Sequence, residues 1–287
     1  MKFLIIGGDR RQIETAKLLS NEGHDVSVFG LNKLAQWYEG IPEVVSIAQG
    51  VSDCDGVILP IPMSRDGIRV NAPFADDDIF LAEIFYSVKP QTVLFGGAVR
   101  KKLVETAEYR DIKVVDYYDS ESVKIKNARL TAEGAVGIVI NKTNRAVMGS
   151  KILVCGWGRI AKFTAKYLKS LGADVCVSSR KAEHRTTIEC LGFGAVNTDD
   201  MGDVIGSFDV VINTVPALVI NRDLLFKCKK EVFILDLASM PGGVDFASAK
   251  EFCLDTVHAL SLPAQIAPVT SAEVITRAIL EYFDETD

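Results

Sequence analysis

The sequence predicts an α/β fold of two domains, each built on a mainly parallel β-sheet. Three observations predict it. Short β-branched runs alternate with longer segments of helical period, which is the pattern of βαβ units. The same strand-and-turn pattern occurs twice along the chain. Finally, 287 residues with 48% hydrophobic side chains suffice for two domains of ordinary size, each with its own core.

The overall charge and the apolar runs exclude several functional classes. Thirty-eight acidic against thirty-two basic side chains leave a formal charge of -6 and a pI near 5.3, so we expect neither nucleic acid nor a membrane as partner. The first apolar run, Phe3 to Ile6, is too short for a signal-peptide core, and no stretch approaches the roughly 18 apolar residues of a membrane helix. Six cysteines without a CxxC pair favour a reducing cytoplasm, and we expect no metal site.

The internal repeat defines the domain organisation. The strand Lys2 to Gly7 matches Lys151 to Gly156, and the strand Gly23 to Val28 matches Gly172 to Val177, both at a separation of 149 residues. Strand, turn, helix and second strand therefore have equal lengths in the two copies, which chance similarity between buried strands explains poorly. We predict two Rossmann-like, doubly wound domains with a cleft between them.

Later strands extend both copies, with a changed separation. In the first copy they are Asp55 to Pro60 and Thr92 to Gly96; in the second they are Asp209 to Pro216 and Val232 to Asp236. Any two parallel α/β domains would share part of this similarity, so these matches add less than the first two.

Two helices are expected to complete the domains. Residues 131–148 have an apolar face of helical period and end at Gly149, which predicts a connector helix. A C-terminal helix is predicted for Ser271 to Phe283, and residues 271–287 are expected to pack back on the first domain. The predicted boundaries are 1–130 for a substrate-side domain and 131–270 for the connector helix with the cofactor-binding domain.

The turn after the first strand of the second copy is typical of a dinucleotide site. Gly156 permits a tight turn, Gly158 lets the backbone approach a pyrophosphate, and Ala161 allows close packing of helix on strand. The diphosphate would then lie on N–H groups at the positive end of the helix, beside Arg159 and Ile160.

The first copy differs at the decisive position of this turn. Asp9 stands where Gly158 stands in the second copy, so a side chain and a like charge would meet a diphosphate there. The first domain is therefore a poor dinucleotide site and is free for another ligand. A plain N-cap of the following helix is an equally good interpretation of Asp9.

The next strand of the cofactor domain ends without the acidic residue that accepts hydrogen bonds from a ribose 2′-hydroxyl. Ser178, Ser179 and Arg180 stand there instead. Charge-assisted bonds to a 2′-phosphate, each worth roughly 1.5–3 kcal/mol, would favour NADP over NAD by about tenfold or more. NAD stays an alternative cofactor, and an ordinary basic surface loop is the alternative interpretation of these residues.

Two further turns follow neighbouring strands of the cofactor domain. Ligands of open α/β sheets bind outside the carboxyl ends of the strands. We therefore include Thr214, Pro216, Asp236, Ala238 and Ser239 among the candidate cofactor contacts, although both segments would also suit plain loops.

Six segments, in order and over nearly the whole chain, match one known family: Ile6–Gln12, Thr131–Gly134, Gly156–Arg159, Asn213–Pro216, Leu235–Phe246 and Leu262–Thr270. Together they resemble the A subunits of dipicolinate synthase. The resemblance implies two Rossmann-like domains akin to formate and 2-hydroxyacid dehydrogenases, and NAD(P)-dependent oxidation of dihydrodipicolinate to dipicolinate. It also implies that the partner is a flavoprotein-like B subunit, and that the place of action is the mother cell of a sporulating bacterium. We further expect a homo-oligomer.

A ring substrate with two carboxylates requires fixed cations. Asp9, Arg10 and Arg11, at the start of the first helix, are substrate candidates, the two arginines because guanidinium groups suit carboxylates. Solvated arginines on a helix surface are the alternative for at least one of them. Thr131 and Glu133 resemble a capping pair at the head of the connector helix, where the domains are expected to meet, and are further substrate candidates.

No catalytic base stands out. Among three histidines, His258 follows a strand-like run and either borders the cofactor or caps the strand. Two rival functions stay open. A 2-hydroxyacid dehydrogenase of similar architecture, acting on another small carboxylate, is expected to have an arginine where Ala238 to Met240 stand. A nonenzymatic NADP-binding scaffold or sensor would need no base.

Overall fold

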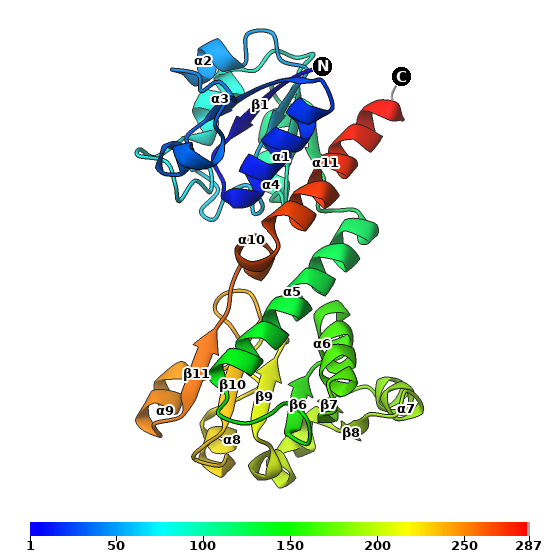
Figure 1. Cartoon of the computed structure of the whole chain (residues 1–287). Coiled ribbons are helices and arrows are strands. Elements are labelled where there is room, and N and C mark those ends of the chain that lie inside the picture. Colours follow the sequence, from blue (N-terminus) through cyan, green and yellow to red (C-terminus); the bar gives the residue numbers. More distant parts are fainter. Residues whose placement is uncertain (286–287) are drawn as a thin grey trace. The chain divides into compact units, whose positions relative to one another are not determined.

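The computed structural model describes residues 1–285 and divides into two compact units. The first comprises Met1–Lys126 and the C-terminal segment from Ala267, and the second comprises Asn127–Ile266. Each unit has one parallel sheet with helices on both faces (Figure 1). The predicted α/β class with two parallel-sheet domains is therefore confirmed.

The first unit has a five-stranded sheet in the order β2-β1-β3-β4-β5. Its strands are β1 (Lys2–Ile6), β2 (Asp25–Phe29), β3 (Gly56–Ile58), β4 (Val93–Gly96) and β5 (Val114–Asp116). Its helices are α1 (Arg10–Asn21), the 3-10 helix η1 (Asn32–Trp37), α2 (Ile47–Gly50), α3 (Leu81–Ser87), α4 (Lys101–Glu108) and α11 (Pro268–Asp284). From β1 the chain continues to β2 on one side of the sheet and later returns to β3 on the other side. The topological switch point therefore lies between β1 and β3.

The alternation of side chains along β1 explains why this strand forms the centre of the sheet. Leu4 and Ile6 pack into the core on one face, while Phe3 and Ile5 pack into the core on the other, and all four are fully buried. A parallel strand covered on both faces needs such a continuous apolar run.

The C-terminal helix α11 packs beside α1 within the first unit, as Figure 1 shows in red and blue. Ile275 and Ile279 join the core that contains Ile13 and Leu19 of α1. Burying one such side chain contributes about 1.5–3 kcal/mol. The helix begins earlier than predicted, at Pro268, because proline suits the first helical turn. Residues 286–287 of the predicted segment lie outside the described residues.

The second unit has a six-stranded sheet in the order β11-β10-β9-β6-β7-β8. Its strands are β6 (Lys151–Cys155), β7 (Asp174–Ser178), β8 (Gly194–Val196), β9 (Val210–Asn213), β10 (Phe233–Asp236) and β11 (Asp255–His258). Its helices are α5 (Glu121–Lys142, from Asn127 onward), α6 (Arg159–Ser170), α7 (Ala182–Cys190), η2 (Thr198–Asp203), η3 (Ile205–Ser207), α8 (Arg222–Lys227), α9 (Phe246–Glu251) and α10 (Leu262–Ile266). Here the switch point lies between β6 and β9.

The sequence repeat corresponds to a structural repeat. Lys2 pairs with Asp25 in the first sheet as Lys151 pairs with Asp174 in the second. After each first strand a glycine N–H donates to the end of the second strand: Gly7 to the Phe29 carbonyl at 2.8 Å, and Gly156 to the Ser178 carbonyl at 3.0 Å.

The predicted bounds of the connector helix are wrong at both ends. Instead of residues 131–148, α5 spans Glu121 to Lys142. At its end, the Thr143 hydroxyl donates to the carbonyls of Val139 at 2.8 Å and Arg145 at 3.2 Å, and the irregular segment before β6 follows. Such side-chain bonds to backbone carbonyls compete with continuation of a helix.

Candidate functional site

The turn between β6 and α6 leaves an open backbone at the start of a helix. Gly156 has a φ of +100°, and a Cβ there would lie 2.8 Å from Thr214 Oγ1, so this position requires glycine. Gly158 is exposed, and a Cβ added to it would meet nothing within 4 Å. Gly158 also caps α6 without a side-chain hydrogen bond. Open space at the positive end of a twelve-residue helix fits a dinucleotide pyrophosphate.

The residues that follow Gly158 are placed as this role requires. Arg159 begins α6 and is exposed, and Ile160 is half-buried against the core of the second unit. Ala161 is fully buried, which allows α6 to pack closely on the sheet.

The loop after β9 is held against the end of β6. The Thr214 N–H and hydroxyl both donate to the Cys155 carbonyl, at 3.1 and 2.8 Å. Pro216 is exposed in the same loop. The structure therefore brings Thr214 and the glycine turn together at the switch point between β6 and β9, where doubly wound sheets bind ligands.

The corresponding turn of the first unit is filled by its own side chains. Gly7 and Gly8 are buried, and a Cβ at Gly7 would lie 2.7 Å from the Cβ of Ala72. Asp9 is the N-cap of α1: its carboxylate accepts from the Arg11 N–H at 3.1 Å, and the Gln12 side chain accepts from the Asp9 N–H at 3.1 Å. A carboxylate of the protein thus occupies the anion position that is open at Gly158.

Arg11 is engaged within the protein. Its side chain is 4% exposed, and it forms a fork on Asp9, with Nε to Oδ1 at 2.9 Å and a terminal nitrogen to Oδ2 at 2.8 Å. The same nitrogen donates to the Ile61 carbonyl at 2.8 Å. Burial would lower the pKa of Arg11, but the hydrogen bond and charge of Asp9 outweigh it and raise that pKa. Arg11 therefore ties the loop after β1 to the loop after β3.

Arg10 is differently placed. Its guanidinium carbon lies 4.3 Å from the centre of the Trp37 ring, in a cation–π contact. Its Nε is buried without a hydrogen-bond partner among the described residues. Of the two arginines, Arg11 is paired with Asp9, and Arg10 has no ion pair with a described residue.

The capping-pair interpretation of Thr131 and Glu133 is wrong, because α5 begins at Glu121 and both residues lie in its interior. Thr131 is buried and its hydroxyl donates to the Asn127 carbonyl at 2.9 Å. Glu133 is exposed and pairs with Arg129 at 3.6 Å.

The three residues at the end of β7 that were expected to bind a 2′-phosphate differ in their exposure to solvent. Ser178 is fully buried, so its hydroxyl does not reach the surface, and its role as a cofactor contact stays a prediction. Its register opposite Cys155 in the sheet interior explains this burial. Ser179 is 7% exposed, whereas the Arg180 side chain is 70% exposed and lies 3.8 Å from the Asp199 carboxylate.

Two residues of α7 that the sequence interpretation did not include hold this segment in place. His184 Nδ1 lies 3.2 Å from the Ser179 hydroxyl. Arg185 donates from one terminal nitrogen to the carbonyls of Ser179 at 2.9 Å and Arg180 at 2.7 Å. Both residues lie in the first turns of the helix that follows β7, and this position in the sequence could have identified them.

Asp236 is held by hydrogen bonds within the protein, and its role as a cofactor contact stays a prediction. It is fully buried, and its Oδ1 accepts from Asn213 Nδ2 at 2.7 Å and from the Ala238 N–H at 3.0 Å. Its Oδ2 accepts from the Gly243 N–H at 2.7 Å. Because all these bonds point into the protein, the carboxylate shapes the loop 237–243, which presents Ser239 to solvent. Ala238 is buried in this loop.

Asn213 extends the same network to the neighbouring loop. Its Oδ1 accepts from the Val215 N–H at 3.0 Å, and its Nδ2 donates to the Val215 carbonyl at 3.0 Å. The pair Asn213 and Asp236 therefore fixes the loops after β9 and β10 relative to each other. Sequence reasoning missed Asn213 as a functional residue.

His258, at the end of β11, supports this network. Its Nε2 lies 2.7 Å from the Ala238 carbonyl, and its ring stacks on Phe246 at a centroid distance of 5.3 Å. Because a carbonyl oxygen can only accept, Nε2 carries the proton of this bond. This contact fits the interpretation of His258 as a residue that caps the strand.

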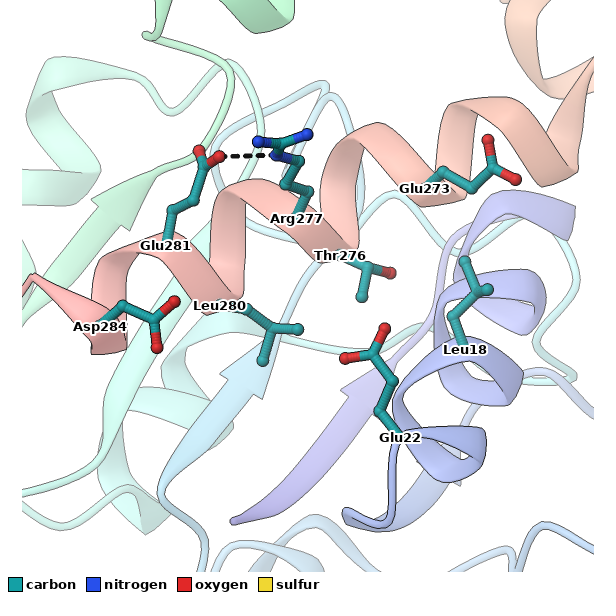
Figure 2. A pocket seen from close by; sticks show the side chains of 8 residues that line it. All are labelled: Leu18, Glu22, Glu273, Thr276, Arg277, Leu280, Glu281 and Asp284. Atoms are coloured by element: carbon teal, nitrogen blue, oxygen red, sulfur yellow. Dashed lines mark hydrogen bonds and ion pairs between the residues drawn. The ribbon is translucent and has the colours of Figure 1, made fainter.

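Two hollows away from these loops are poor candidates for substrate or cofactor. Figure 2 shows one of about 370 Å³ between α1 and α11. Its lining includes the carboxylates Glu22, Glu273 and Asp284, and its Arg277 pairs with Glu281 at 2.7 Å. Its carboxylates would repel a dicarboxylate. Another of about 560 Å³ lies at the amino ends of the second sheet's strands, opposite the glycine turn.

Among residues 1–285, no group of three or more His, Cys, Asp or Glu side chains is arranged to hold a metal ion. No helix within the described part of the chain is both long and apolar enough to cross a membrane.

Comparison with known proteins adds to this geometry. Residues 2–118 match the family described as the N-terminal domain of the dipicolinate synthase A subunit. The dipicolinate synthase A subunit of Bacillus subtilis (strain 168) is 28% identical over 286 residues, covering 99% of this chain and 96% of that protein. Along its whole length the chain is similar to dipicolinate synthase A subunits, and its N-terminal part matches the model of that family's N-terminal domain. The resemblance drawn from the sequence motifs is thus confirmed.

Two solved structures of this family agree with the fold along the whole chain. The dipicolinate synthase A chain from Bacillus subtilis has a TM-score of 0.84 at 28% identity, covering 99% of this chain and 96% of that one. The dipicolinate synthase A subunit from Bacillus halodurans has a TM-score of 0.85 at 26% identity, covering 98% and 97%.

The cofactor class follows from the second unit. Residues 123–239 match the family described as the D-isomer specific 2-hydroxyacid dehydrogenase, NAD binding domain. This range includes the glycine turn, and it supports an oxidoreductase with a nicotinamide dinucleotide as cofactor.

Proposed function

We propose that this protein catalyses the oxidation of dihydrodipicolinate to dipicolinate, with NADP, or alternatively NAD, as the hydride acceptor. The observation that carries the proposal is the similarity, over 99% of the chain, to the A subunit of a dipicolinate synthase. The open glycine turn at Gly158 supports it independently, because it fits a dinucleotide where the first unit does not.

The reaction removes a hydride and a proton from the dihydro ring and leaves an aromatic ring. The nicotinamide, when bound, takes up the hydride. Because aromatisation favours the product, the protein's main tasks are to bind and orient the ring, with less need for a strong base. The N-terminus of α6 at Gly158 would hold the diphosphate, and Ser179 with Arg180 would contact a 2′-phosphate.

On the substrate side we assign Arg10, and not Arg11, to a substrate carboxylate. Arg10 forms no ion pair with a described residue, whereas Arg11 already uses Nε and one terminal nitrogen on Asp9 and the Ile61 carbonyl. A guanidinium held over Trp37 has a defined orientation, and its terminal nitrogens would pair with a carboxylate.

The biological setting belongs to the same proposal. Because the relatives are A subunits, a second type of subunit is expected, which the family resemblance makes a flavoprotein-like B subunit. We propose that the protein forms a homo-oligomer and acts in the cytoplasm of the mother cell of a sporulating bacterium.

Purified protein given dihydrodipicolinate and NADP should increase the absorbance of reduced nicotinamide, measured with and without the second subunit. Arg10→Ala should raise the KM for dihydrodipicolinate about tenfold, since it removes one charge-assisted bond. Arg277→Ala, which removes an exposed arginine of α11, serves as the control and should leave KM unchanged. Coenzyme binding without any reduction would instead indicate a scaffold or sensor.

Coenzyme choice has its own test. Arg180→Ala should weaken NADP binding about tenfold and leave NAD binding nearly unchanged, because the exposed guanidinium would contact only the 2′-phosphate. Calorimetric titration with each coenzyme measures both affinities. Lys181→Ala, the neighbouring exposed cation, controls for general charge. Equal losses for both coenzymes would show that Arg180 does not recognise the 2′ position.

A further inference from the structure

The first unit has a hollow of about 540 Å³ over α3 and α4 that the proposed reaction does not use. It is lined by Ala82, Phe85, Tyr86, Lys102, Glu105, Thr106, Tyr109 and Arg110, which we name the α3–α4 surface. Two large aromatic side chains lie open to solvent there, with Tyr86 75% exposed and Tyr109 93% exposed. A folded chain gains nothing from such exposure, so these rings suggest a surface that is covered in a complex.

The aromatic part of this surface is already ordered. The guanidinium carbon of Arg110 lies 4.1 Å from the centre of the Tyr86 ring. Its Nε also donates to the Phe85 carbonyl at 3.1 Å. Tyrosine and arginine at a hollow are the side chains that dominate binding energy in protein interfaces. Because Arg110 and Tyr86 are fixed in advance, a partner would not bear the entropy of ordering them.

The charges of the α3–α4 surface indicate what the partner brings. Lys102 and Arg110 have no carboxylate partner among the described residues, while the one carboxylate of the lining, Glu105, pairs with Lys101 at 3.7 Å. The hollow is thus cationic on a chain of net charge -6. Its complement is a segment with a carboxylate next to an apolar side chain.

We propose that the α3–α4 surface docks an acidic segment with an apolar anchor on the second dipicolinate synthase subunit. This inference rests on the proposed function for the existence of that subunit. Within the complex, the anchor fills the hollow between Tyr86 and Tyr109, and the segment's carboxylate pairs with Lys102 or Arg110.

The test is a titration of the full-length chain with the purified second subunit of the same organism. Tyr109→Ala should weaken binding at least about tenfold, as expected for an interface hot spot, and Lys102→Glu should weaken it by a similar factor. Both side chains are solvent-exposed, so neither change should affect folding, which a thermal melt checks. Phe226→Ala removes a ring of similar exposure, 77%, from the second unit and should bind like the wild type.

Wild-type affinity in both surface variants, or no binding by the wild type, would overturn the docking proposal. A change in the sedimentation of the chain alone in Tyr109→Ala would also overturn it, because the surface would then join two copies of this chain. The oxidation assay separates this proposal from the proposed function. Oxidation without subunit binding overturns only the docking surface, and binding without oxidation overturns only the activity.

Discussion

Gly158→Asp is expected to abolish dinucleotide binding while leaving the protein folded. The substitution reproduces in the second unit the residue that the first unit has at the same place, where Asp9 caps α1. A carboxylate at Gly158 would accept the N–H groups of α6 and repel a diphosphate. One added charge at about 4 Å costs about 4 kcal/mol at an effective dielectric constant near 20. The affinity should therefore fall by about 1,000-fold, measured by calorimetry.

Stability should change little in this variant, because a Cβ at Gly158 meets nothing within 4 Å and aspartate is a good N-cap. Gly158→Asn is the matched control, since it has nearly the same shape without the charge and should retain more affinity than Gly158→Asp. Undiminished binding by Gly158→Asp would place the nucleotide elsewhere. Asp9→Gly should gain no nucleotide binding, because Ala72 and Gln12 still fill the first turn.

The fold was predictable because the requirements of parallel strands and glycine turns determine residue types directly. β1 and β6 are buried on both faces and need unbroken apolar runs, and Gly156 must adopt a φ that other residues avoid. The three-residue strands β5 and β8 were not predicted, because they are only partly buried and lack such a run. The start of α5 was missed because six of its first ten residues are polar, although Val123, Ala128 and Leu130 among them are buried.

The direction of a side chain at the end of a strand was much harder to predict. Ser178 and Asp236 both follow apolar runs next to candidate ligand loops, yet both are fully buried. Burial at these positions depends on strand register and on the path of the next loop, which the sequence alone does not specify. One signal was available: Asn213 and Asp236 end two strands, and the register pairs them in the sheet. Two hydrogen-bonding residues at equivalent strand ends are good candidates for a buried pair.

Asp236→Ala should be the most destabilising of the substitutions considered. It leaves Asn213 Nδ2 and the N–H groups of Ala238 and Gly243 without their acceptor inside the protein. Buried donors that lose a charged partner cost about 3–5 kcal/mol in total. At about 2–4 °C per kcal/mol for a chain of this size, the Tm of the second unit should fall by about 6–20 °C. Differential scanning calorimetry measures it.

The same substitution should also weaken coenzyme binding, because the loops after β9 and β10 lose the bonds that fix them to each other. Asp199→Ala removes an exposed carboxylate from the same unit and should shift the Tm by less than about 2 °C. Asp236→Asn separates charge from hydrogen bonding. The asparagine side chain can still accept at Oδ1, but its NH2 group would face the Gly243 N–H. The fall in Tm of this variant should therefore be intermediate. If Asp236→Ala melted like Asp199→Ala, the buried carboxylate would not be what holds these loops.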